Sequence, residues 1–195
     1  MTLLFTSKAR TLALLLGKLH SAQISPLVYF TVADWEADRA ECITRVKQLL
    51  GEGPWIVRSS CQREDGTNES NAGAFLSLPD VTPENLELSI DQVIAAYGEL
   101  NIADEVLVQP MLQNVVFSGV AFSHDPNTCA PYRVVNWSEG KDTAAVTGGK
   151  GGHTWQQAAM SPLETPAKLA GVVVLLEELL DLFGLVPVDF EFAVT

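Results

Sequence analysis

The sequence has few cationic side chains. Its 195 residues include 12 Lys and Arg against 24 Asp and Glu, which gives a formal charge of −12. Duplex nucleic acids and anionic membranes attract Lys and Arg, so we expect neither as a partner. The negative charge does not exclude a ligand with phosphate groups. One phosphate site needs only a few cations and backbone N–H groups, and Mg²⁺ can supply further positive charge.

Cysteine and long apolar runs are also scarce. The three cysteines show no CxxC or CxxH spacing, so we expect neither a disulfide framework nor a zinc site, and a reducing cytosol fits best. The N-terminus has no charged n-region and no A-x-A-like cleavage site. Two glutamates interrupt the most apolar stretch, 169–180, so no run approaches the roughly 20 apolar residues of a membrane helix. We expect a soluble, cytoplasmic protein.

Propensity and hydrophobic periodicity predict an α+β fold. Helices are predicted over 8–17, 34–50, 82–100 and 166–183, and a loop over 62–73. Strands are predicted over 27–32, 55–57, 75–78, 105–111, 115–123, 132–137, 143–147, 154–160 and 188–194. This order predicts two lobes with a cleft between them: a mixed α/β lobe over 1–103, and a strand-rich lobe over 104–195 that ends in a helix–strand unit. A single mixed sandwich is the alternative.

Arg58 stands where the predicted strand 55–57 ends, followed by Ser59 and Ser60. A guanidinium in this place needs acceptors. The residues alone favour an ion pair with Glu64 or Asp65 in the following loop, because Arg–carboxylate pairs are common. The other interpretation is that Arg58 contacts phosphate oxygens, with the loop folding over them.

Five fragments resemble, in the same order, segments of the N-terminal ATP-binding, ATP-grasp-type domain of the phosphoenolpyruvate synthase and pyruvate phosphate dikinase family. They are VRSSCQRED at 57–65, NAGAFLS at 71–77, VLVQPM at 106–111, FSGVAFSHDP at 117–126 and DFEFA at 189–193. Each fragment alone is a weak match, whereas five in order over 57–193 are specific.

The resemblance implies roles for five residues. Arg58 matches the arginine that contacts the ATP phosphates, and the resemblance implies that it is the catalytic residue of this domain. Lys8 matches a second phosphate contact, and Gly73 a position where backbone approaches the nucleotide. Gln109 matches a glutamine that lines the nucleotide pocket. Glu191 matches the carboxylate that binds Mg²⁺, so ATP and Mg²⁺ are the implied ligands.

Some positions depart from the family pattern or have a simpler explanation. Thr6 and Ser7 replace the glycines that precede the family's lysine, and the segment after residue 73 is shortened. Gln109 could instead satisfy neighbouring backbone. Alternation places Asp189 and Glu191 on one face of the last strand, which suits Mg²⁺ but equally suits an edge facing solvent.

The glycine-rich segment 148–152 lacks the Walker pattern, so we interpret it as a flexible hairpin or lid tip. The stretch 151–154 resembles the family's phospho-histidine segment only superficially, because Gln156 stands where the histidine would be. We therefore expect His153 in a surface loop. His20 and His124 show no catalytic pattern.

The implied function is Mg-ATP binding within a dikinase-type phosphotransferase, in which ATP phosphorylates a histidine on a separate domain and an acceptor domain follows. Neither domain is present in the 195 residues, so we expect a fragment of a longer enzyme, or a stand-alone nucleotide binder, that is inactive alone. The alternative is a degenerate, non-catalytic nucleotide-binding or scaffold module. A third possibility is an α+β binding protein without a nucleotide, if the motif matches are accidental.

Overall fold

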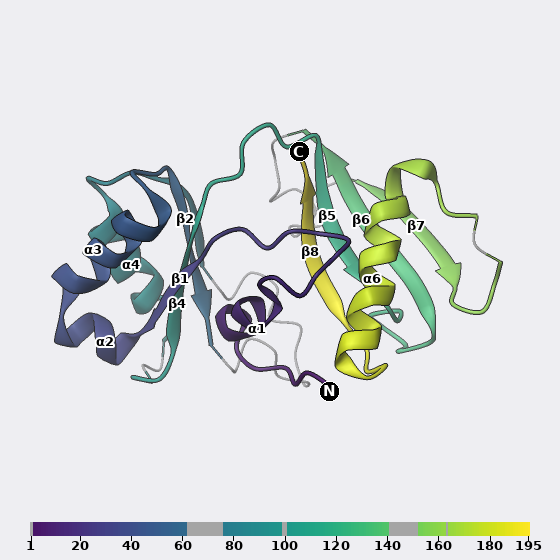
Figure 1. Cartoon of the computed structure of the whole chain (residues 1–195), viewed down its shortest axis with the longest axis horizontal. Coiled ribbons are helices and arrows are strands. Elements are labelled where there is room, and N and C mark those ends of the chain that lie inside the picture. The colour runs from purple at the N-terminus through teal and green to yellow at the C-terminus, as the bar shows by residue number, and fades with distance from the viewer. Residues whose placement is uncertain (1, 62–75, 99–100, 141–151, 163) are drawn as a thin grey trace. The chain divides into compact units, whose positions relative to one another are not determined.

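A computed structural model describes residues 2–61, 76–98, 101–140, 152–162 and 164–195. The chain forms two compact units (Figure 1). Unit 2 comprises residues 5–18 and 24–111, and unit 1 comprises residues 1–4, 19–23 and 112–195. Each unit has helices and one antiparallel four-stranded sheet, so the predicted α+β class with antiparallel sheets is confirmed.

The sheet of unit 2 has the strand order β1-β4-β2-β3. Its strands are β1 (Val28–Thr31), β2 (Trp55–Ser60), β3 (Ser77–Val81) and β4 (Glu105–Pro110). Its helices are α1 (Lys8–Leu15), α2 (Val32–Ala37), α3 (Arg39–Leu50) and α4 (Leu86–Ala95). Figure 1 shows α2, α3 and α4 on one side of this sheet and α1 on the other.

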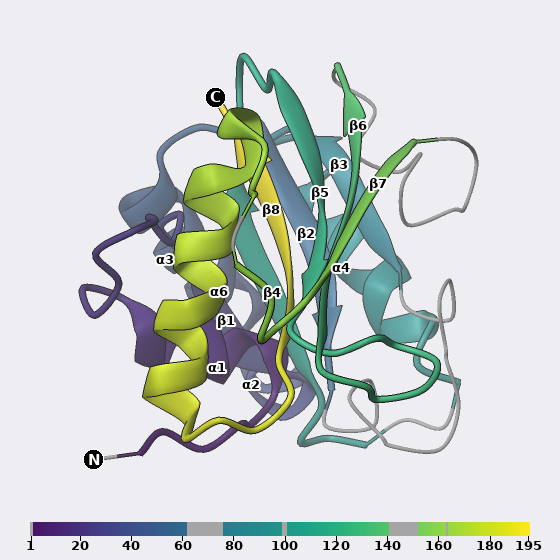
Figure 2. The same cartoon turned by 90° about the vertical axis from the view of Figure 1, so that its right-hand side faces the viewer.

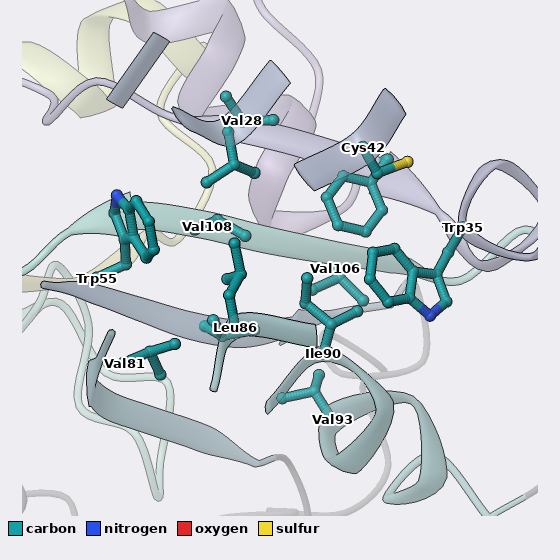
Figure 3. Close-up of a cluster of buried hydrophobic side chains, with 13 residues drawn as sticks. Val28, Trp35, Cys42, Trp55, Val81, Leu86, Ile90, Val93, Val106 and Val108 are labelled. Carbon is teal, nitrogen blue, oxygen red and sulfur yellow. The ribbon is translucent and has the colours of Figure 1, made fainter. Parts of the chain in front are cut away.

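The core of unit 2 lies between the sheet and the helices α2 to α4. Alternate residues of the strands point into it, and the helices contribute large apolar side chains. Figure 3 shows this cluster, whose buried members include Val28, Phe30, Trp35, Cys42, Trp55, Val57, Leu86, Ile90, Val106 and Val108. The opposite face of the same sheet is not covered by these three helices.

The predicted helix over 34–50 is in fact two helices. Asp38 has φ −154° and ψ 89°, which is not a helical conformation, and its side chain accepts a hydrogen bond from the Glu41 backbone N–H at the start of α3. A capping box between Thr31 and Asp34 starts α2 earlier than predicted. In the sequence, the polar residues Asp38 and Arg39 interrupt the apolar helical face between Trp35 and Cys42, at the point where α2 ends and α3 begins.

The predicted helix over 82–100 is shorter, because Thr82 and Pro83 belong to a turn. Asn85 occupies the N-cap position of α4, and its side-chain oxygen accepts a hydrogen bond from the Thr82 backbone N–H. The sequence Thr82-Pro83-Glu84, which favours an N-cap at Thr82, therefore does not begin the helix, and α4 ends at Ala95.

The sheet of unit 1 has the order β7-β6-β5-β8, formed by β5 (Phe117–Phe122), β6 (Tyr132–Glu139), β7 (His153–Ala158) and β8 (Asp189–Val194). A short 3-10 helix, η1 (Ala167–Leu169), leads into α6 (Ala170–Phe183), which ends at Gly184 in a left-handed conformation. Figures 1 and 2 show α6 along one face of this sheet. The core between them includes Phe117, Ala121, Val135, Leu169, Val172 and Leu176.

Strand β4 pairs with β1 and β2, so the predicted boundary between residues 103 and 104 falls inside unit 2. The N-terminal part of the chain is also divided, because residues 1–4 and 19–23 group with unit 1. The predicted loop over 62–73 and strand over 143–147 lie outside the described residues. In the part of the chain that is described, no helix combines the length and apolar character needed to cross a bilayer.

Candidate functional site

The face of the unit 2 sheet opposite its core carries two of the predicted site residues. Directly paired residues on neighbouring strands share a face, and Arg58 pairs with Leu107 while Ile56 pairs with Gln109. Val57 and Val108, which alternate with them, are buried in the core. Arg58 and Gln109 therefore point away from that core, and both are partly buried.

Helix α1 packs on this second face and brings Lys8 to it. The Ala9 backbone N–H donates to the Ser60 hydroxyl at 2.8 Å, and Ser60 lies two residues after Arg58 on the same face. Lys8, the first residue of the helix, is partly buried. Arg58 and Gln109 thus lie on one face of the sheet, and Lys8 belongs to the helix that packs on this face. These are three of the five residues that the sequence predicted for the site.

A hydrogen-bond network around Glu105 fastens α1 to this face. The Glu105 carboxylate accepts from the Ser7 hydroxyl and from Arg10 Nε. Ser7 is also the N-cap of α1, since its hydroxyl accepts from the Arg10 backbone N–H at 3.4 Å. Glu105 was not among the site residues predicted from the sequence. Glu105 is the first residue of the predicted strand 105–111, where an acid is usually solvated, so the sequence did not single it out.

The two interpretations of Gln109 are not separated by its contacts. Its amide Nε2 donates to the Ser25 carbonyl oxygen at 3.5 Å, the long limit of a hydrogen bond. The contact with backbone is thus present but weak.

Three other predicted residues lie outside the described residues. They are Glu64 and Asp65, the expected ion-pair partners of Arg58, and Gly73, the predicted nucleotide contact.

Glu191 lies on the face of the unit 1 sheet opposite α6. Phe190 and Phe192 pack against the core, whereas Asp189 and Glu191 are exposed on the other side of β8, as the alternation predicted. The strand β8 is at the edge of the described sheet. Both the metal-site and the solvent-edge interpretations predicted this exposure.

Further polar groups share the Glu191 face. Val120 pairs with both Glu191 and Asn136, and Thr154 beside Asn136 donates to its side-chain oxygen at 2.8 Å. Ser118, two residues from Val120 on the same strand, is 3% exposed, and its hydroxyl has no hydrogen-bond partner among the described residues.

The donor chemistry of this face fits Mg²⁺. That ion takes carboxylate oxygens and is commonly held by one or two carboxylates together with substrate phosphates. Asp189 and Glu191 supply two carboxylates from alternate positions of one strand. No group of three or more His, Cys, Asp and Glu suited to a metal occurs among the described residues.

The three histidines make different contacts. The His20 backbone N–H donates to Glu178 at 2.7 Å. The ring of His124 is hydrogen-bonded through Nδ1 to the Ser123 hydroxyl at 2.9 Å. His153 was predicted in a loop, but it begins β7 and its ring stacks on Trp137 with centroids 5.2 Å apart.

Comparison with known proteins finds similarity in structure and not in sequence. No protein-family model matches the sequence, and no curated protein sequence matches it. Among solved structures, the chain is similar to D-alanine–D-alanine ligase from Helicobacter pylori, with a TM-score of 0.42 and 16% sequence identity. The match covers 88% of this chain and 42% of the ligase, so the chain spans less than half the length of that enzyme.

Proposed function

We propose that this chain binds Mg-ATP in an ATP-grasp-like fold, as the nucleotide-binding part of a phosphotransferase of the phosphoenolpyruvate synthase type. The observation that carries the proposal is the position of Arg58 and Gln109 on the face opposite the unit 2 core, with α1, which begins at Lys8, packed on that face. The five ordered sequence fragments and the two antiparallel sheets support it.

In this proposal the chain's own residues bind and neutralise phosphate. The guanidinium of Arg58 and the ammonium of Lys8 donate to phosphate oxygens, and Gln109 contacts the nucleotide. Glu191, with Asp189 beside it, would hold Mg²⁺, and the ion would supply positive charge that offsets the charge of the phosphates. Gly73 is proposed to bring backbone close to the nucleotide.

The partner in this proposal is a histidine on another domain. That histidine would take the phosphoryl group from ATP and pass it to an acceptor on a third domain, so the chain itself provides binding and orientation. The cytosol is the proposed location, since three cysteines without CxxC or CxxH spacing do not indicate a disulfide framework.

A second candidate is a degenerate module that binds nucleotide without supporting transfer. It is favoured by Ser7, which replaces a family glycine and whose side chain is engaged with Glu105 and the helix N-terminus. A side chain bonded in this way closes space that a glycine would leave open to phosphate. The two candidates differ in transfer, and both predict nucleotide binding.

Calorimetric titration with Mg-ATP tests the proposal, and Arg58→Ala locates the site. We expect this substitution to weaken binding by about 1.5–3 kcal/mol, the size of a charge-assisted hydrogen bond, with little change in the melting temperature. Arg39→Ala is the matched control, because Arg39 lies on α3, on the core side of the sheet. Normal binding by Arg58→Ala together with a lower melting temperature would instead establish the structural ion pair.

Transfer is tested separately by adding a purified histidine-carrier domain of the family and radiolabelled Mg-ATP. Label on the carrier histidine supports the phosphotransferase. Binding without any label supports the degenerate module.

A further inference from the structure

The carboxylate of Glu105 is buried, with the residue only 2% exposed, at the first position of β4. A buried carboxylate costs several kcal/mol unless it is paired and hydrogen-bonded. Here Arg10 Nε donates to Oε1 and the Ser7 hydroxyl donates to Oε2. Ser7 is the N-cap of α1 and Arg10 lies in its first turn, so both oxygens of the carboxylate are bound to the start of one helix.

The backbone of Glu105 belongs to the same network. Its carbonyl oxygen accepts from the Tyr97 hydroxyl, which in turn accepts from the Ser60 backbone N–H at 3.0 Å. The Ser60 hydroxyl accepts from Ala9 in α1 at 2.8 Å. The bonds therefore form a closed loop through α1, β2, the segment after α4, and β4.

Charge strengthens this anchor. The hydrogen bond and the negative charge of Glu105 raise the pKa of Arg10 further above its already high value. A guanidinium is a cation at all ordinary pH values in any case, so the ion pair does not depend on the pH of the solution through Arg10. The Arg10 side chain is 54% exposed and that of Glu105 is 3% exposed. The carboxylate is thus the fixed partner, and the helix is held to it.

We propose that Glu105 is a positioning residue for phosphate binding. It fixes the first turn of α1 so that Lys8, which lies between Ser7 and Arg10, is held at the face that carries Arg58 and Gln109. This inference rests on the proposed function. A cation held in place before the ligand arrives binds phosphate without an ordering cost, and a displacement of about 1 Å can remove most of the benefit.

The anchoring step is tested without nucleotide. In Glu105→Gln the amide presents a donor to one of its two partners, which are themselves donors, so the turn should loosen. We expect the backbone amides of Ala9 and Arg10 to exchange hydrogen at least about tenfold faster than in the wild type. Glu87→Gln, the same chemical change on α4, should leave them unchanged. Unchanged exchange in Glu105→Gln would overturn the inference.

The positioning step is tested by a double-mutant cycle on Mg-ATP affinity. Lys8→Met should weaken binding about tenfold in the wild type but less than about twofold in Glu105→Gln, because the lysine is no longer held there. Equal losses in both backgrounds would show that Glu105 is only structural and would overturn the inference. Should Glu105→Gln fail to fold, Arg10→Gln takes its place, since it removes one bond from an exposed side chain.

The two proposals fail in different ways. If the wild type does not bind Mg-ATP, the proposed function is wrong, and with it the role of Glu105 in phosphate binding. Hydrogen exchange then still decides whether Glu105 anchors α1. If the wild type binds and the cycle shows no coupling, only the positioning role is wrong.

Discussion

At the scale of single residues, Gly119 shows how the distance between two strands limits a side chain. A Cβ at this position would lie 2.1 Å from the Asn136 carbonyl oxygen and 2.9 Å from the Trp137 Cα. Both are backbone atoms of β6, paired with β5 through this residue, and they cannot move aside without disturbing the sheet. The glycine is therefore a packing residue.

We predict that Gly119→Ala lowers the free energy of unfolding by about 2 kcal/mol or more, because the added methyl group overlaps backbone. Gly171→Ala is the matched control. Gly171 lies in α6, and a Cβ added there would meet no atom within 4 Å, so alanine should be neutral or stabilise by up to about 1 kcal/mol. Chemical denaturation of both variants measures the difference. Equal effects of the two changes would contradict the strand-spacing argument.

A second residue-scale prediction concerns Glu191. Glu191→Gln keeps the shape and removes the charge, so the Mg²⁺-dependent part of nucleotide affinity should fall about tenfold, the loss of about 1.4 kcal/mol. Affinity without Mg²⁺ should change less, and so should stability, because the side chain is exposed. Titrations at several Mg²⁺ concentrations check this, with Glu87→Gln as a control. An unchanged Mg²⁺ dependence would remove Glu191 from the site.

At the scale of elements, the segment 19–23 is docked on α6 through one carboxylate. Glu178 accepts hydrogen bonds from the His20 and Ser21 backbone N–H groups at 2.7 and 3.0 Å and from the Ser21 hydroxyl. Burial alone would raise the pKa of Glu178, but the hydrogen bonds from Ser21 and His20 outweigh it and lower the pKa. The charged form is therefore the one that docks this segment.

This lowered pKa predicts a pH-dependent contribution to stability. The contribution is fully present above the unfolded-state pKa, about 4.3, and is lost as the pH falls through the lower folded-state pKa. Glu178→Gln should therefore reduce the melting temperature near neutral pH, and the difference from the wild type should shrink below about pH 4. Asp181→Asn, an exposed acid on the same helix, is the control. A difference that stays constant with pH would contradict this assignment.

The sequence predicted those elements whose faces are encoded by local alternation. In β8 the order Asp189, Phe190, Glu191, Phe192 directly specifies an exposed acidic face and a packed aromatic face. The polar break at Asp38 was visible too, although its meaning as a helix boundary depended on a backbone conformation that periodicity does not report.

The rest depended on pairing between distant segments. Strand β4 looked like the start of the second lobe by sequence order, yet its partners are β1 and β2. The role of Glu105 required knowing that α1, some 95 residues earlier, packs on it. Such a contact leaves no periodic signal, because an acid beginning a strand is usually solvated.

At the scale of the whole molecule, we predict that these 195 residues alone produce no phosphoenolpyruvate. None of His20, His124 and His153 belongs to a segment like the family's phospho-histidine, and the rings of His124 and His153 contact Ser123 and Trp137. Incubation with Mg-ATP and pyruvate should give neither phosphoenolpyruvate nor a phospho-histidine by mass spectrometry. Addition of the histidine-carrier domain is the positive control for the phospho-histidine signal. Phosphoenolpyruvate formed by this chain alone would contradict the proposal that the histidine and the acceptor belong to other domains.

The assignment of residues 1–4 and 19–23 to unit 1 has a consequence for synthesis on the ribosome. Unit 2 uses residues up to 111 only, whereas Leu3 bonds to the carbonyl oxygen of Leu182 and His20 to Glu178. Chains emerge from the N-terminus and fold as their domains become complete. Unit 2 can therefore fold while the nascent chain is still growing. The segments 1–4 and 19–23 can bind to α6 only after that helix has left the exit tunnel.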